Sequence, residues 1–320
     1  MLLTGIQSPD SIRIKQTGRL NHALNFAHKN WCRPLTLNQL ADSACLSKYH
    51  FSRLFQRYTG ESPLSLLKRI RLENCAYLLS YHGELSINQI ALNSGFSSQQ
   101  TFSRAFDRQF GQCPRQFRQQ FSENLPAALS PGLANQYAAT TLAELTGQRS
   151  LQKPYQLRLA HLPATRVAYF RNIGSYGVSD GIDSALASIR HWARKNDLWQ
   201  AGSKCIGASW DSNQITPNLY CKYDACIRIP DDYHVDRTIS TQWLPAGRYA
   251  IYRAAYRSSG EISLIWRVFT RYLRTAPRFS TYCMSSKPCF EIFDQNQHTG
   301  EPEVELYIQL VRRFGDSESS

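Results

Sequence analysis

Several signatures of catalysis and metal binding are missing from this chain of 320 residues. Its nine cysteines include no Cys-x-x-Cys pair, and none of its eight histidines completes the close Cys/His pairs that a zinc site requires. There is also no Gly-x-Ser-x-Gly elbow, phosphate-binding loop or glycine-rich dinucleotide motif. We therefore expect no enzyme, no metal and no cofactor, and we expect the cysteines to be reduced and packed as small apolar residues.

Signatures of membrane attachment are missing as well. No stretch of about 18 uninterrupted apolar residues occurs, so a membrane-spanning helix is not expected. The first five residues, Met-Leu-Leu-Thr-Gly, do not join a basic segment to an apolar run as a signal peptide does. The sequence thus predicts a cytoplasmic location and no membrane partner.

Basic residues, by contrast, are abundant and unevenly spread. The formal net charge is +13. Residues 1–125 hold 15 Lys and Arg against 7 Asp and Glu, whereas the other 195 residues hold 22 against 17. The N-terminal part is therefore more than twice as basic per residue, and it is the better place to look for a face that binds nucleic acid.

A repeat of about 50 residues lies in this basic part. The pairs Leu40-Ala41 and Leu46-Ser47 recur 50 residues later as Ile-Ala and Phe-Ser, and the run Phe-Ser-Arg-Leu-Phe at 51–55 recurs 51 residues later as Phe-Ser-Arg-Ala-Phe. Each copy has helical spacing, a break, and helical spacing again. Ser47 is expected to cap the second helix of the first copy, and Gly95 to form the turn of the second copy. Each copy therefore predicts a helix-turn-helix unit.

The second helix of each unit has an apolar back and a polar front. An Arg side chain can bond guanine with two donors, and Gln can pair with adenine in the same bidentate way. A solvated helix face would look similar, but two copies in a basic region favour reading of double-stranded DNA. The polar fronts consist of Tyr49, Ser52, Arg53 and Gln56 in the first unit and Gln99, Gln100, Ser103, Arg104 and Asp107 in the second.

Residues 63–81 read as one helix between the units. Eighteen or so residues at about 1.5 Å each give roughly 27 Å. Successive major-groove faces lie about 34 Å apart. A helix of this length can hold both helix-turn-helix units, which we call the two readers, on one side of a duplex.

A second repeat occupies the C-terminal half. Leu162-Pro163-Ala164 returns as Leu244-Pro245-Ala246, and residues 167–171 match 249–253 at the same offset of 82. Helix-like and then strand-like stretches follow each copy. We expect an N-terminal all-α domain with two helix-turn-helix units joined by a long helix, and a C-terminal α+β domain of two duplicated strand-helix-strand-strand units. The expected bounds are 16–121 for the first domain, 122–155 for a linker with a short helix near 138–145, and 156–314 for the second domain.

Residues 18–120 resemble the DNA-binding domain of the AraC/XylS family of transcription regulators. Cys113 stands where Ser or Thr is more usual. The stretches that carry the resemblance are residues 35–41, 51–55, 90–91, 95–98, 102–106 and 110–114. The resemblance implies that the base-reading residues are Tyr49, Ser52, Arg53, Gln99, Gln100, Ser103 and Arg104, which all belong to the polar fronts.

Residues 156–313 resemble the GyrI-like effector-binding domain, so that the order of domains is similar to that of Rob-type regulators. Such domains are duplicated α+β folds that often bind cationic, aromatic ligands around a buried Glu. Residues 254–257 read Ala-Ala-Tyr-Arg where a Gly-Pro-Tyr turn is commoner, and Phe293 stands where Tyr is frequent. The stretches that carry this resemblance are residues 167–169, 206–207, 215–217, 223–226, 244–250, 288–291 and 306–308.

Glu291 is the candidate anchor for such an effector. It shares a strand face with Cys289 and Phe293, so it is an acid among apolar groups, which costs free energy unless something pairs with it. The alternative is a rim Glu that pairs with an arginine or is solvated. The expected ligand is a lipophilic cation, because aromatic faces also attract cations. The expected aromatic walls are Tyr169, Trp210, Phe293 and Tyr307.

The sequence as a whole therefore predicts a sequence-specific transcription regulator that binds promoter DNA, senses a small-molecule effector and contacts RNA polymerase. Two alternatives remain for the C-terminal half. It could dock on a protein such as gyrase or polymerase, or it could hydrolyse a small molecule with a Glu and a nearby Tyr.

Overall fold

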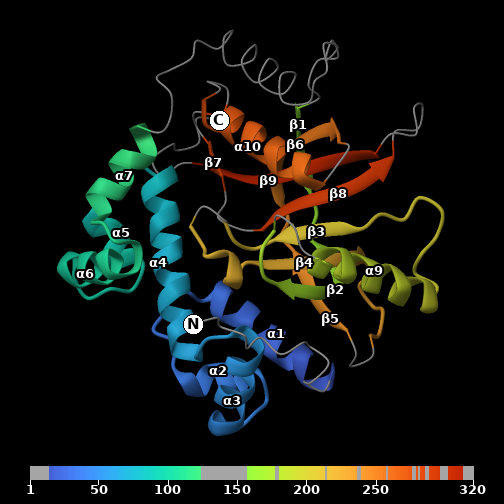
Figure 1. Ribbon diagram of the computed structural model, residues 1–320, viewed down its shortest axis with the longest axis horizontal. Coiled ribbons are helices and arrows are strands. Elements are labelled where there is room, and N and C mark those ends of the chain that lie inside the picture. Colours follow the sequence, from blue (N-terminus) through green and yellow to red (C-terminus); the bar gives the residue numbers. More distant parts are fainter. Residues whose placement is uncertain are drawn as a thin grey trace. The chain divides into compact units, whose positions relative to one another are not determined.

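The computed structural model describes most of the chain as two compact units (Figure 1). The first unit contains the helices up to Ser122 together with the segments Gln214–Tyr220 and Pro230–Gln242, and the second contains most of a large sheet. The described residues are 14–123, 157–176, 180–212, 215–235, 239–256, 259–275, 279, 282–284, 288–295 and 302–312. The expected linker, with its short helix near 138–145, lies outside them except for residues 122 and 123.

The first unit consists of helices. α1 and α7 were not individually predicted from the sequence; α1 contributes the fully buried Leu20 and Leu24 to the core. The helices are α1 (Ile14–Lys29), α2 (Leu37–Ser43), α3 (Lys48–Thr59), α4 (Pro63–Tyr81), α5 (Ile87–Asn93), α6 (Gln99–Phe110) and α7 (Pro114–Glu123).

The two helix-turn-helix units, α2–α3 and α5–α6, begin with the same local device. At the start of α2, the Thr36 hydroxyl accepts the Gln39 amide at 3.3 Å, and the Gln39 side chain accepts the Thr36 amide at 2.9 Å. Ser86 and Gln89 form the same reciprocal pair at the start of α5, at 3.1 and 2.8 Å. These capping boxes satisfy backbone donors that a helix start leaves unpaired, and they explain why both units begin where they do.

The turns of the two units differ in one residue. Gly95 has a φ of +79°, which glycine adopts without strain, whereas Cys45 takes the equivalent place with a φ of +52°. Ser47 lies at the N-cap position of α3 as expected, but its side chain makes no capping hydrogen bond. The turn is therefore held by backbone contacts, such as the bond from the Leu46 amide to the Ala41 carbonyl at 3.0 Å.

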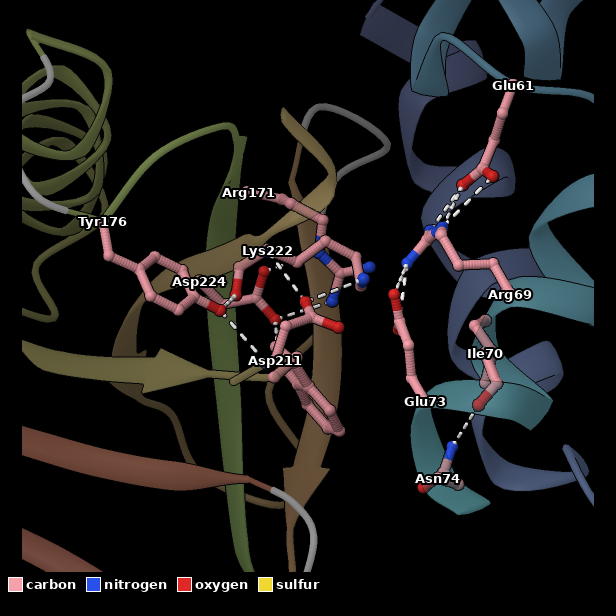
Figure 2. Close-up of polar contacts among 11 residues, drawn as sticks. Glu61, Arg69, Ile70, Glu73, Asn74, Arg171, Tyr176, Asp211, Lys222 and Asp224 are labelled. Atoms are coloured by element: carbon pink, nitrogen blue, oxygen red, sulfur yellow. Dashed lines mark hydrogen bonds and ion pairs between the residues drawn. The ribbon is translucent and has the colours of Figure 1, made fainter. Parts of the chain in front are cut away.

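A buried ionic cluster lies at the start of α4 (Figure 2). Arg69 Nη1 donates to both carboxylate oxygens of Glu73 at 3.0 Å, and Arg69 Nε donates to Glu61 at 3.1 and 3.2 Å. All three side chains are less than a tenth exposed. The guanidinium thus satisfies two buried carboxylates at once.

The second unit is built on a single sheet of nine strands within the described residues. Eight follow the order β1-β6-β9-β8-β3-β4-β2-β5, and β7 pairs with β9. The strands are β1 (Leu157–Leu162), β2 (Thr165–Ile173), β3 (Ile206–Ser209), β4 (Lys222–Arg228), β5 (Ser240–Leu244), β6 (Gly247–Ala255), β7 (Tyr282–Met284), β8 (Cys289–Gln295) and β9 (Pro302–Arg312).

Two helices, α9 (Asp180–Lys195) and α10 (Ser259–Thr275), pack on the sheet (Figure 1). α9 contacts β2 and β4, and in α10 Phe269 stacks on Tyr252 of β6 with ring centroids 5.4 Å apart. The opposite face carries an apolar cluster that includes Tyr169, Tyr249 and Phe290. The sheet therefore has two distinct faces, and the face that a side chain occupies decides which groups it can meet.

A second buried ionic cluster lies on β2 and β4 (Figure 2). Arg171 Nε donates to Asp224 at 2.6 Å, and both side chains are almost fully buried. Lys222 Nζ contacts Asp211 at 2.8 Å, again with both side chains buried. These acids each have a basic partner.

Candidate functional site

The polar front of α3 is exposed. Tyr49 is 81% exposed, which is unusual for an aromatic side chain and leaves it free to contact another molecule. Arg53 is also exposed, and Ser52 is partly exposed. The back of the helix, with Phe51 and Phe55, is fully buried. The amphipathic pattern therefore orients the three predicted residues outward together.

The polar front of α6 repeats this arrangement. Gln99, Gln100 and Arg104 are exposed and Ser103 is partly exposed, while Phe102 and Phe106 are fully buried. The Ser98 hydroxyl accepts the Thr101 amide at 3.1 Å and so fixes the start of this helix. The second front thus offers two amides and a guanidinium.

Glu291 lies on β8, buried and only 7% exposed. Tyr223 of β4 donates its hydroxyl to one carboxylate oxygen at 2.5 Å, and Trp266 of α10 donates its indole N–H to the other at 3.1 Å. Both donors are neutral. Within the described part of the chain, Glu291 takes part in no ion pair, so a buried acid stands here without a basic partner.

Gly207 makes the Tyr223–Glu291 contact possible. β3 lies between β4 and β8, and Gly207 is paired with Glu291 on one side and Ala225 on the other. A Cβ at this position would stand 2.0 Å from the Tyr223 hydroxyl and 2.8 Å from Glu291 Cγ. The phenol therefore crosses β3 in the space that a side chain would fill.

Burial sets the proton affinities of this cluster. Burial raises the pKa of Glu291 above its ordinary value, and the bonds from Tyr223 and Trp266 oppose the rise. Burial and the nearby Glu291 raise the pKa of Cys289 to about 12. Burial and the Glu291 charge also raise the pKa of Tyr256. A cation placed beside Glu291 would counter the cost of its ionisation.

The predicted aromatic walls divide between the two faces of the sheet. Phe293 shares the face of Glu291, and its ring lies 6.2 Å from that of Tyr256. Tyr169 and Tyr307 belong to the apolar cluster on the opposite face. Trp210 donates to Asp224 at 2.6 Å, and Asp224 is on that opposite face too. The structure therefore brings Phe293 toward Glu291 but not Tyr169, Trp210 or Tyr307.

Tyr223 and Trp266 were missed from the sequence, although they are the two direct partners of Glu291. Tyr223 lies in one of the stretches that carry the resemblance, but its face becomes known only when β3 is paired on both sides. Trp266 comes from a helix, and its position depends on how α10 packs. Trp266 and Tyr256 are only partly buried, so the groups that cover Glu291 also reach the surface.

The described residues contain no cluster of three or more His, Cys, Asp or Glu side chains arranged to hold a metal ion. None of the helices in the described part of the chain has the length and apolarity needed to cross a membrane.

Family models match two separate segments of the chain. Residues 40–120 match a helix-turn-helix domain, and residues 155–311 match a GyrI-like small molecule binding domain. The first match covers most of α2–α7, and the second covers the sheet and its two helices.

The curated relatives match in the N-terminal region. The HTH-type transcriptional regulator AlkR of Acinetobacter baylyi is 43% identical over 101 residues, which are 32% of this chain and 33% of AlkR. The right origin-binding protein of Escherichia coli is 36% identical over 103 residues, 32% of this chain and 35% of that protein. The chain thus spans about a third of the length of these relatives.

Solved structures match each part separately. An AraC-type DNA-binding regulator from Chromobacterium violaceum is 31% identical and covers 33% of this chain and 95% of its own, with a TM-score of 0.32. The C-terminal domain of EcmrR is 13% identical and covers 50% of this chain and 99% of its own, with a TM-score of 0.40.

Proposed function

Because this chain joins an AraC-type helix-turn-helix domain to a GyrI-like domain, in the manner of Rob-type regulators, we propose that it is a transcription regulator that reads promoter DNA and responds to a small-molecule effector. The observation that carries the proposal is the pair of equivalent helices, α3 and α6, each with a buried aromatic back and an exposed polar front. The packing of a single core does not require two helices with equivalent exposed faces. Contact with two adjacent segments of the major groove does require them.

The finer architecture is part of the proposal. We infer that α4 joins the two readers as a long helix, and that the sheet arose from two strand-helix-strand-strand units with β2 and β6 as equivalent strands. Arg171 of β2 pairs with Asp224 of β4, and Arg253, 82 residues later, pairs with Glu303 of β9. Each unit thus has an Arg at the same position of its first strand and an acid on the strand beside it, which supports duplication. We also propose domain bounds of 16–121 and 156–314.

The proposed base readers are the seven residues Tyr49, Ser52, Arg53, Gln99, Gln100, Ser103 and Arg104. A bidentate contact from Arg to guanine discriminates against other bases by about 1–3 kcal/mol. We therefore expect Arg53→Ala or Arg104→Ala to weaken binding to a specific site about 5- to 150-fold, and binding to scrambled DNA much less.

The test is a titration of both DNAs at one salt concentration, because phosphate contacts depend strongly on salt. Arg115→Ala removes one exposed charge from α7 and is the matched control. Equal losses on specific and scrambled DNA would make Arg53 or Arg104 a phosphate contact instead of a base reader.

The proposed effector is a lipophilic cation anchored by Glu291. Burial of the carboxylate without a basic partner in the described residues supports this, as do the neighbouring rings of Trp266, Tyr256 and Phe293. We expect tetraphenylphosphonium to quench the tryptophan fluorescence of the full chain through Trp266, and Glu291→Gln to weaken that binding at least tenfold, since a charge pair is lost.

Glu303→Gln is the matched control, because Glu303 is a strand carboxylate that already pairs with Arg253. If the Glu291 variant binds the cation as tightly as the parent, Glu291 is not the anchor.

One contact favours hydrolysis as a second candidate for the C-terminal half. Tyr223 donates to Glu291 at 2.5 Å, and a buried carboxylate of raised pKa is a better general base than a solvated one. Hydrolysis of an electrophilic aryl ester that disappears in both Tyr223→Phe and Glu291→Gln would support it. Unchanged substrate after prolonged incubation would leave effector binding as the role of this cluster.

A further inference from the structure

The loop between α1 and α2, residues 30–35, presents its backbone carbonyls to Arg71 of α4. Arg71 Nε donates to the Trp31 carbonyl at 3.2 Å, and Arg71 Nη2 donates to the Arg33 carbonyl at 2.7 Å. A guanidinium that bridges two carbonyls has both its position and its plane restrained. Arg71 therefore ties the loop to the helix between the readers.

The carbonyl between these two meets the turn of the second reader. A Cβ built on Gly95 would lie 2.6 Å from the Cys32 carbonyl oxygen and 3.9 Å from Arg71 Cζ. The guanidinium of Arg71 also lies 5.9 Å from the ring centroid of Phe96, the next residue of that turn. Three consecutive carbonyls of one loop thus approach Arg71 and Gly95 together.

These contacts join parts that the chain order keeps separate. α1 and α2 pack together and with α3, so the loop belongs to the first reader, while Gly95 and Phe96 belong to the second. In Figure 1, α4 runs between the pair α2–α3 and the pair α5–α6. A helix alone can bend or twist between two modules, but a second contact away from its axis resists both motions.

We propose that Arg71 and Gly95 are positioning residues that hold the two readers in one relative orientation, and that they thereby set the spacing at which two half-sites are accepted. This proposal rests on the function proposed above. Two rigidly connected modules gain affinity only when the spacing of the half-sites matches their own, whereas loosely connected modules accept several spacings with less gain at each.

The experiment measures affinity of the full chain for duplexes in which the two half-sites of a specific site are moved apart or together one base pair at a time. A duplex with only one half-site is included. The variants are Arg71→Lys, Arg71→Gln and Gly95→Ala. Lys68→Gln removes an exposed charge from the same helix, and Gly60→Ala places a Cβ at the same φ of +79° where nothing lies within 4 Å.

For the parent chain we expect one preferred spacing. In the Arg71 variants and in Gly95→Ala, affinity at that spacing should fall about tenfold, affinity at neighbouring spacings should change less, and single half-site affinity should stay constant. Arg71→Lys keeps the charge but not the two-carbonyl bridge, so it should resemble Arg71→Gln. Lys68→Gln and Gly60→Ala should keep the profile of the parent.

Three results would overturn the proposal. An unchanged spacing profile in all three variants would show that α4 alone sets the orientation. A uniform loss at every spacing and on the single half-site would make Arg71 a DNA contact or a local stability determinant. The same flattening in Gly60→Ala would assign the effect to glycine strain. A parent chain without sequence-specific binding would instead contradict the proposed function itself.

Discussion

Buried carboxylates occur in both units, but they have different partners. In the helical unit, Glu61 and Glu73 share one guanidinium, that of Arg69. In the sheet unit, Glu291 receives hydrogen bonds only from the neutral Tyr223 and Trp266 among the described residues. All three acids are less than a tenth exposed.

The charge balance explains what each group can do. Burial alone would lower the pKa of Arg69, but the bonds and charges of Glu61 and Glu73 outweigh it and raise that pKa. Each carboxylate of the Arg69 cluster thus has a cationic partner, and we assign the cluster a structural role. Burial raises the pKa of Glu291, and no cation among the described residues opposes the rise, so this site gains from an external one.

The sheet unit itself supplies a reference. Asp224 is fully buried on the opposite face, and it pairs with Arg171 as well as accepting Trp210. Burial within a sheet therefore does not by itself leave an acid unpaired. What distinguishes Glu291 is its set of partners.

The largest effect is expected for Arg69→Met. Removal of one partner from a buried ionic cluster typically costs about 3–5 kcal/mol, because the remaining charges stay buried without compensation. Urea unfolding of the full chain, followed by helix content, measures the loss. The triple variant Glu61→Gln, Arg69→Met, Glu73→Gln should recover much of it, and a loss below about 1 kcal/mol in the single variant would contradict the structural role assigned to this cluster.

A smaller effect is expected for Gly207→Ala, which tests whether Glu291 depends on Tyr223. The added methyl group would overlap the phenol and the carboxylate side chain, at a cost of about 1–3 kcal/mol. Tetraphenylphosphonium binding should be lost with it. Gly83→Ala, where nothing lies within 4 Å of the new Cβ, should leave binding intact. Undiminished binding in Gly207→Ala would separate the cation site from the Tyr223–Glu291 pair.

The pH dependence of Glu291 sharpens the contrast further. The pKa of Glu291 is raised in the folded state. The contribution of the protonated acid to folding stability is therefore fully present below its ordinary pKa of 4.5, and it is lost as the pH rises through the pKa of the folded state. The free energy of unfolding of the parent should therefore fall with rising pH relative to Glu291→Gln. Cation affinity should rise over the same range in the parent only. Parallel stability curves for the two proteins would show that Glu291 has no raised pKa.

The smallest effect concerns the two turns of the helical unit. A non-glycine residue in the left-handed region costs about 1–2 kcal/mol of strain. Replacing it with glycine removes this strain, but glycine loses more conformational entropy on folding, which offsets part of the gain. Cys45→Gly should therefore stabilise the chain by up to about 1 kcal/mol in the same urea assay. Gly95→Cys should destabilise it, both through the positive φ and because the new Cβ would lie 2.6 Å from the Cys32 carbonyl oxygen. A destabilised Cys45→Gly variant would mean that the thiol makes packing contacts that outweigh the strain.

Sequence alone determined the features that depend on neighbouring residues. Helical spacing placed the buried backs and exposed fronts of α3 and α6, and turn chemistry placed Gly95 at a positive φ. These follow because a helix brings together residues three and four positions apart, whatever the rest of the chain does. Strand alternation likewise predicted that Glu291 and Phe293 share a face.

Tertiary structure alone decided what lies opposite Glu291. Alternation states which residues of one strand share a face. Only the pairing of β8, β3, β4 and β2 shows that Tyr223 belongs to the face of Glu291 and that Tyr169 does not. Trp266 donates to the carboxylate from a helix, 25 residues before Glu291 in the sequence. Tyr223, 68 residues before Glu291, reaches it because Gly207 has no side chain to block the phenol where it crosses β3. The periodicity of a single strand carries no information about such contacts, because they depend on register and on helix packing between distant segments.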